Sequence, residues 1–158
     1  MKQIIIGIDP GSRTTGYGLI ASNGQQHRYI ASGSIKTTHD HLSMKLCEIY
    51  TCVNELIRVH HPNMAAIEQV FMHKNANSAL KLGQARGVAI VAIASHAIPL
   101  AEYAPREIKR AIVGTGSADK SQMQHMVKIL LKLDQVPPHD AADALGIAIC
   151  HAHSVRLR

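Results

Sequence analysis

Residues 3–22 read QIIIGIDPGSRTTGYGLIAS, and this stretch decides the fold class of the chain. The apolar run 3–9 is typical of a buried strand, and Pro10-Gly11 predicts the turn that ends it. Residues 14–22 predict a second strand, Asn23-Gly24 a hairpin turn, and residues 27–36 a third strand. The beginning of the chain therefore predicts three antiparallel strands, with Asp9 at the end of the first.

Helical and extended patterns alternate in the rest of the sequence. From Leu42 the apolar residues recur every three or four positions, which predicts an amphipathic helix that ends at His61-Pro62. Strands are expected over 64–70 and 98–104, and helices over 75–96, 105–112, 122–132 and 139–153. This order predicts an α/β fold, a mixed sandwich of strands and helices.

The composition indicates an ordinary globular chain. With 158 residues and 46% hydrophobic content, residues 1–158 are expected to form one domain with a full core. The sequence has neither an apolar stretch of 18 residues nor a basic-then-apolar leader, so we expect no membrane span and no signal peptide. Three cysteines without a CxxC motif favour a reducing, cytoplasmic compartment.

Positive charge is concentrated in the middle of the chain. Residues 69–133 hold nine Lys or Arg and three acidic residues, so this segment carries the whole formal net charge of +6. A solvated basic surface is the simplest interpretation, and a polyanionic partner is the functional one. Charge alone does not distinguish nucleic acid from acidic lipid. Within this segment we assign Lys74 and Arg110 as DNA contacts, although Arg110, like Lys109, could simply be surface charge on a short helix.

Four carboxylates occupy positions that suit metal chemistry. Asp9 ends the first strand, Glu68 lies near the end of the fourth, and Asp140 and Asp143 are three residues apart, on one face of the last expected helix. Convergence of these oxygen ligands at one sheet edge would suit Mg²⁺ and two-metal phosphodiester hydrolysis. Alternatively, Asp140 and Asp143 are ordinary first-turn helix acids, and Glu68 is a surface strand residue.

Several motifs have structural interpretations beside the functional ones. An acid-glycine turn such as DPGSRTTG also holds nucleotide phosphates in actin-like ATPases, although those need two such lobes and a longer chain. The GSADKS loop could be an N-capping turn with Ser117 or Asp119 as the cap. Phe71 is either a core residue or an exposed ring able to stack on an unpaired base. The histidines lack the complete spacing of a structural zinc site.

Four motifs together resemble the RuvC-type Holliday junction resolvases, which are crossover-junction endonucleases of bacteria with an RNase H-like fold. The motifs are GIDPGSRTTGYG, IEQVFMHKNANSALKLGQARG, YAPREIKRAIVGTGSADKSQMQ and HDAADALGIAI, in this order and along nearly the whole chain. The resemblance implies an RNase H-like mixed five-stranded sheet flanked by helices.

The resemblance also implies roles for individual residues. Asp9, Glu68, Asp140 and Asp143 match the catalytic metal ligands of the family, and His139 is an alternative to Asp140. Lys109 and Lys120 match basic residues that support cleavage, and Phe71 matches the aromatic residue that stacks on a base of the opened junction. The helix with Gly83 and Gly87 matches the dimerisation helix, in which Gly87 could also pack internally.

The implied activity is the resolution of four-way junctions in homologous recombination and DNA repair. Two Mg²⁺ ions in each active site, with Mn²⁺ as a substitute, would support hydrolysis of one phosphodiester by each subunit of a homodimer. The implied partners are junction DNA and a branch-migration motor of the RuvA and RuvB type, in the bacterial cytoplasm and without a membrane. The alternatives are a catalytically idle junction-binding module and an RNase H-like nuclease that cuts RNA–DNA hybrids.

Overall fold

The computed structural model describes residues 2–70 and 75–156 and contains a mixed five-stranded sheet. The sheet order is β3-β2-β1-β4-β5. β1 pairs antiparallel with β2, which pairs antiparallel with β3, whereas β1, β4 and β5 run parallel. The strands are β1 (Gln3–Asp9), β2 (Thr14–Ser22), β3 (His27–Lys36), β4 (Met64–Glu68) and β5 (Leu100–Tyr103). The expected mixed five-stranded α/β sheet is therefore confirmed.

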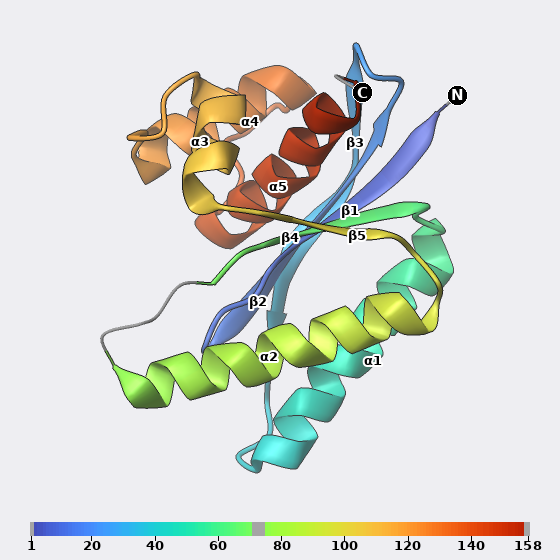
Figure 1. Cartoon of the computed structure of the whole chain (residues 1–158), viewed down its shortest axis with the longest axis vertical. Helices are drawn as coiled ribbons and strands as arrows, with labels where there is room; N and C mark the ends of the chain where they lie inside the picture. Colours follow the sequence, from blue (N-terminus) through green and yellow to red (C-terminus); the bar gives the residue numbers. More distant parts are fainter. Residues whose placement is uncertain (1, 71–74, 157–158) are drawn as a thin grey trace.

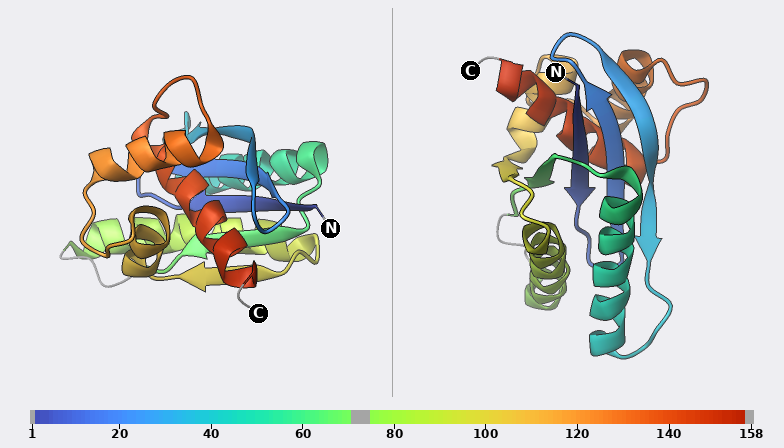
Figure 2. Two further views of the ribbon diagram at one scale, coloured as in Figure 1. Left: turned by 90° about the horizontal axis from the view of Figure 1, so that it is seen from above. Right: turned by 90° about the vertical axis from the view of Figure 1, so that its right-hand side faces the viewer.

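Helices cover both faces of the sheet. α1 and α2 pack on one face, and α3, α4 and α5 gather on the other (Figures 1 and 2). The helices are α1 (Leu42–His60), α2 (Ala76–Ser95), α3 (Pro105–Val113), α4 (Lys120–Leu131) and α5 (His139–Arg156). None of the described helices combines the length and the apolar character that a membrane crossing needs.

The first strand divides its side chains between two cores because successive strand residues point to opposite faces. Ile6 and Ile8 belong to the core beneath α1 and α2, whereas Ile5 belongs to the core beneath α3, α4 and α5. All three isoleucines are fully buried. The continuous apolar run of β1 is thus explained by burial on both faces, as in parallel strands that are covered by helices.

Glycines in β1 and β2 let α5 lie directly on the sheet. A Cβ atom at Gly7 would stand 2.2 Å from the backbone oxygen of Ala144, and one at Gly16 would stand 2.3 Å from the backbone oxygen of Asp140. Both distances are far below contact, so only glycine permits this approach. These positions fix the depth at which the first turn of α5 sits above β1 and β2.

Most expected elements are confirmed, with shifts of a few residues at their ends. β4 stops at Glu68, because its pairing with β5 ends at Tyr103. Helix α4 begins at Lys120 instead of residue 122, because the Asp119 side chain accepts a hydrogen bond from the Gln122 amide and caps the helix. Asp119, not Ser117, is therefore the N-cap of this helix.

Candidate active site

Asp9 and Glu68 end neighbouring parallel strands. β1 and β4 are in register from Ile5 opposite Met64 to Ile8 opposite Ile67. The next residue of each strand is the acid, so the two carboxylates leave the same edge of the sheet. The pairing of β1 with β4 therefore brings together two acids that are 59 residues apart in the sequence.

The first turn of α5 completes the carboxylate cluster. Gly16 pairs with Asp9 in the sheet, and its missing side chain leaves room for the backbone of Asp140. Asp143 follows three residues later on the same helix face. The hydroxyl of Thr14 donates a hydrogen bond of 3.0 Å to Oδ2 of Asp140 and fixes that side chain above β2.

The carboxylates act strongly on one another. The pKa of Asp9 rises from 3.8 to about 8, first because the group is buried and then because of the charges of Glu68, Asp143 and Asp140. Burial followed by the charge of Asp143 raises the pKa of Glu68, and burial is also the main cause that raises the pKa of Asp143. The four acids therefore form one electrostatic cluster at the β1–β4 edge.

Two lysines lie beside this cluster. Lys120 lowers the pKa of Asp9 and of Asp143, and Lys109 lowers that of Glu68 and of Asp143. Both lysines line a cavity of about 460 Å³ together with Glu68 and Asp143. The positive charge of the lysines reduces the repulsion among the acids. Burial and the neighbouring carboxylates have the larger effect, so the pKa values of Asp9, Glu68 and Asp143 are still raised.

The donor set suits a hard divalent cation. Four carboxylates offer only oxygen ligands, which Mg²⁺ prefers, and their mutual repulsion is what a bound cation would relieve. Within residues 2–70 and 75–156 no three His, Cys, Asp or Glu side chains are arranged as a ready-made metal-ligand group. Mg²⁺ usually binds to one or two protein carboxylates and completes its shell with water and substrate phosphate oxygens. The site therefore fits magnesium that is shared with a phosphate substrate.

Basic side chains continue from this cavity along α3. A neighbouring cavity of about 800 Å³ is lined by Arg106, Lys109, Arg110 and the loop residues Thr115 and Ser117. Lys109 lines both cavities and joins them. Arg110 lines this second cavity, which contains none of the four acids. Phe71 and Lys74, the other two residues assigned to DNA contact, lie outside the described residues, and their roles stay predictions.

Two further functional candidates become evident only in the folded structure. Thr14 holds Asp140, as described above. Arg86 of α2 donates through Nε to the backbone oxygen of Glu68 at 3.4 Å and pairs with the Glu102 carboxylate at 2.8 Å. Thr14 carried no signal beyond its place in the glycine-rich motif. The only sequence signal at Arg86 was its charge, which is unusual among the apolar residues of its helix.

An exposed stripe of small and apolar residues runs along α2. Leu80 is 65% exposed and Val91 is 58% exposed, and Gly83 and Gly87 lie between them on the same helix face. A Cβ atom at either glycine would meet nothing within 4 Å. The expectation that Gly87 could also pack internally is therefore wrong, because its surroundings are open. Both glycines are available for contact with another molecule.

The sheet order, the two helix layers and the edge cluster of acids define the nuclease class of the RNase H-like fold. The chain belongs to the family described as crossover junction endodeoxyribonuclease RuvC, whose model matches residues 5–151. A protein of this description from Coxiella burnetii is 58% identical over 156 residues, which cover 99% of this chain and 91% of the relative. One from Vibrio vulnificus is 59% identical over 152 residues, with coverage of 96% and 88%.

Solved structures agree with this assignment. T. thermophilus RuvC in complex with a Holliday junction substrate superposes with a TM-score of 0.92 at 32% identity and covers 98% of this chain and 96% of that protein. The yeast mitochondrial Holliday junction resolvase Ydc2 gives a TM-score of 0.70 at 15% identity, with coverage of 97% and 79%. At that identity the yeast protein supports the fold alone.

Proposed function

We propose that this chain resolves four-way DNA junctions in homologous recombination and DNA repair by metal-dependent hydrolysis of phosphodiesters. The observation that carries the proposal is the cluster of Asp9, Glu68, Asp140 and Asp143 at one sheet edge, in a chain that belongs to the RuvC family. Acids that raise one another's pKa need a cationic partner, and a phosphate substrate needs the same cation. A divalent cation bound at this edge of the sheet would serve both the acids and the phosphate.

Asp9, Glu68, Asp140 and Asp143 would hold up to two Mg²⁺ ions, with Mn²⁺ as a substitute. Bound in this way, the ions would supply an activated water and stabilise the leaving oxygen. The charge of Asp140 acts on Asp9 and that of His139 acts on Asp143, so both residues lie near the cluster. Asp140 is favoured as the ligand, because its carboxylate is held by Thr14, whereas His139 is exposed.

The protein's own cations would act on the phosphate. Lys109 and Lys120 line the cavity that contains Glu68 and Asp143, so a phosphate that reaches these acids also meets two ammonium groups. Cations fixed there stabilise the negative charge that develops on the phosphate oxygens in the transition state. Arg110, in the adjoining cavity, would bind phosphates that flank the cut, and Phe71 and Lys74 are proposed to contact the DNA bases and backbone.

Self-association would provide the second active site. A four-way junction has two-fold symmetry, and two matching incisions require two sites related by a two-fold axis. The stripe of Leu80, Gly83, Gly87 and Val91 on α2 is suited to such a contact, because small residues permit close approach and exposed apolar residues gain from burial. We therefore propose a homodimer formed through α2. It would work with a branch-migration motor of the RuvA and RuvB type in the bacterial cytoplasm.

Cleavage of a labelled synthetic four-way junction tests the proposal. The protein should nick the junction in Mg²⁺ and not in EDTA, with far slower cutting of a linear duplex and of an RNA–DNA hybrid of the same sequence. Asp143→Asn should bind the junction and leave it intact, and exposed Asp134→Asn is the matched control. Faster cutting of the hybrid than of the junction would refute the proposed substrate.

A further inference from the structure

A second candidate site lies on the opposite face of the sheet from α5. It is a cavity of about 680 Å³ between the β1–β2 turn, the beginning of α1 and the first turns of α2. Ligand cavities commonly fall between about 300 and 1,000 Å³, so the space is sufficient for one nucleotide. The family resemblance assigns no residue of this cavity a role.

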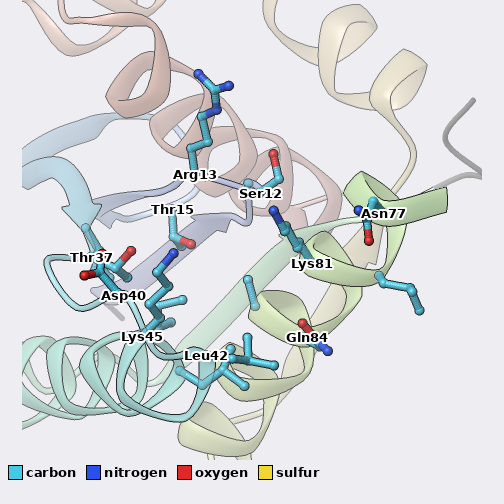
Figure 3. Close-up of a pocket in the computed structure, with 16 residues that line it drawn as sticks. Ser12, Arg13, Thr15, Thr37, Asp40, Leu42, Lys45, Asn77, Lys81 and Gln84 are labelled. Atoms are coloured by element: carbon cyan, nitrogen blue, oxygen red, sulfur yellow. The ribbon is translucent and has the colours of Figure 1, made fainter. Parts of the chain in front are cut away.

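The cavity wall is cationic. Figure 3 shows Lys45 of α1 and Lys81 of α2 extending their ammonium ends toward the β1–β2 turn, with Arg13 at the rim. Asp40 is the only acid among the lining residues. Neither lysine has an ion-pair partner within the described ranges 2–70 and 75–156. Two ammonium groups from separate helices and without a carboxylate partner form an attractive place for an anion.

A buried hydroxyl in the same cavity lacks a partner. Thr15 is 1% exposed, and its Oγ1 has no hydrogen-bond partner among the described residues. An unsatisfied buried hydroxyl costs about 1–3 kcal/mol, so this hydroxyl does not stabilise the unbound protein. Thr15 lies between the two lysines in Figure 3, where its hydroxyl could donate to a ligand oxygen. The lining also includes the aliphatic side chains of Leu42 and Leu46 of α1, a surface suited to a sugar ring.

The position of the cavity indicates which molecule would supply the anion. Gly11 lines the cavity and follows Asp9 by two residues, so the Cα atoms of these two residues lie within about 7 Å of each other. A DNA strand that crosses the β1–β4 edge would reach the cavity within a few nucleotides. We propose that Lys45, Lys81 and Thr15 bind a backbone phosphate of the cleaved strand, a few nucleotides from the cut, with its sugar against Leu42 and Leu46. This inference rests on the proposed function, because it takes the junction as the substrate.

A matched pair of double variants tests the cations. Lys45→Gln/Lys81→Gln should raise the Kd for a four-way junction about tenfold in EDTA and lower the salt slope by about one for each lysine. Lys2→Gln/Arg28→Gln removes the same charge from a cavity at the hairpin end of the molecule and should change the Kd by about twofold at most. Equal effects of the two double variants would overturn the proposed site.

Neutral linkages in the DNA locate the phosphate. A methylphosphonate should be placed in turn at each linkage within a few nucleotides of the cut. At one or two positions it should weaken binding by the wild type and by Lys2→Gln/Arg28→Gln, but not by Lys45→Gln/Lys81→Gln. If no position behaves in this way, the inference is wrong even though the junction is bound. If the wild type does not prefer the junction to linear duplex, the proposed function itself fails.

Thr15→Val separates binding from folding. The isosteric change removes the hydroxyl that lacks a partner, so the melting temperature of the free protein should stay equal or rise. Junction affinity should fall by roughly 10- to 100-fold, as expected for one lost hydrogen bond to a charged group. A lower melting temperature with unchanged affinity would show that the hydroxyl serves the fold and would overturn its role in the site.

Discussion

Replacing Asp9 by Asn should stabilise the metal-free protein at neutral pH. The pKa of Asp9 is 3.8 in the unfolded reference and about 8 in the folded chain. Between these values the unfolded chain carries the charge and the folded chain holds the proton. The unfolded state then binds fewer protons, so stability falls as pH rises from about 4 to about 8. Asn removes this loss because it carries no charge in either state.

The magnitude follows from the two pKa values. At about 1.4 kcal/mol for each pH unit, raising the pH from 3.8 to 7 lowers the free energy of unfolding by about 4 kcal/mol. At pH 4.5 the corresponding loss in the free energy of unfolding is only about 1 kcal/mol. Asp9→Asn should therefore exceed the wild type in free energy of unfolding by about 4 kcal/mol at pH 7 and by about 1 kcal/mol at pH 4.5.

Urea denaturation in EDTA at the two pH values measures this difference. Asp134→Asn, at an exposed surface acid, is the control and should show no comparable gain. Added Mg²⁺ should stabilise the wild type in proportion to its occupancy and should have little effect on Asp9→Asn. An Asp9→Asn variant that is less stable than the wild type at pH 7, or a gain that does not shrink at pH 4.5, would refute the reasoning.

Four further substitutions have distinct expected outcomes. Phe71→Ala should impair junction cleavage with little change in melting temperature, whereas a core phenylalanine would cost about 3–5 kcal/mol of stability, which calorimetry would detect. Lys120→Ala should lower the single-turnover cleavage rate more than junction affinity, and equal losses in both would limit this lysine to general phosphate contact. Gly83→Glu should leave a folded monomer in sedimentation that cuts the junction poorly, because a side chain there meets nothing within the subunit; an unchanged dimer would contradict this interface. Thr14→Val should slow cleavage by releasing Asp140, while Thr14→Ser should restore the rate; failure of Ser to restore it would point to packing.

Local sequence patterns specified most of the secondary structure. The strands at 3–9, 14–22 and 27–36 and the helix that begins at Leu42 have the expected bounds, because short-range periodicity and turn residues decide them. The later elements are shifted by a few residues at their ends, since sheet pairing and capping side chains set those limits. Asp119 is an example, because its capping bond to Gln122 starts α4 two residues earlier than the apolar pattern indicates.

The sequence also marked the four acids, through their strand-end and helix-start positions and through the family resemblance. It did not show how α5 reaches the sheet. That approach depends on Gly7 and Gly16, whose missing side chains leave room for the backbone of α5. Glycine occurs in many strands, so its presence in the sequence did not by itself indicate that a helix packs this closely.

What the sequence alone determined is the order of strands and helices, the excess of positive charge and the identity of the candidate acids. Only the tertiary structure decided that Asp9 has a pKa of about 8, that Thr14 holds Asp140, and that Lys45 and Lys81 face one cavity. Secondary structure follows from neighbours along the chain. Desolvation, mutual charge and cavity shape follow from residues that are distant in sequence and meet only when the sheet and its helices pack.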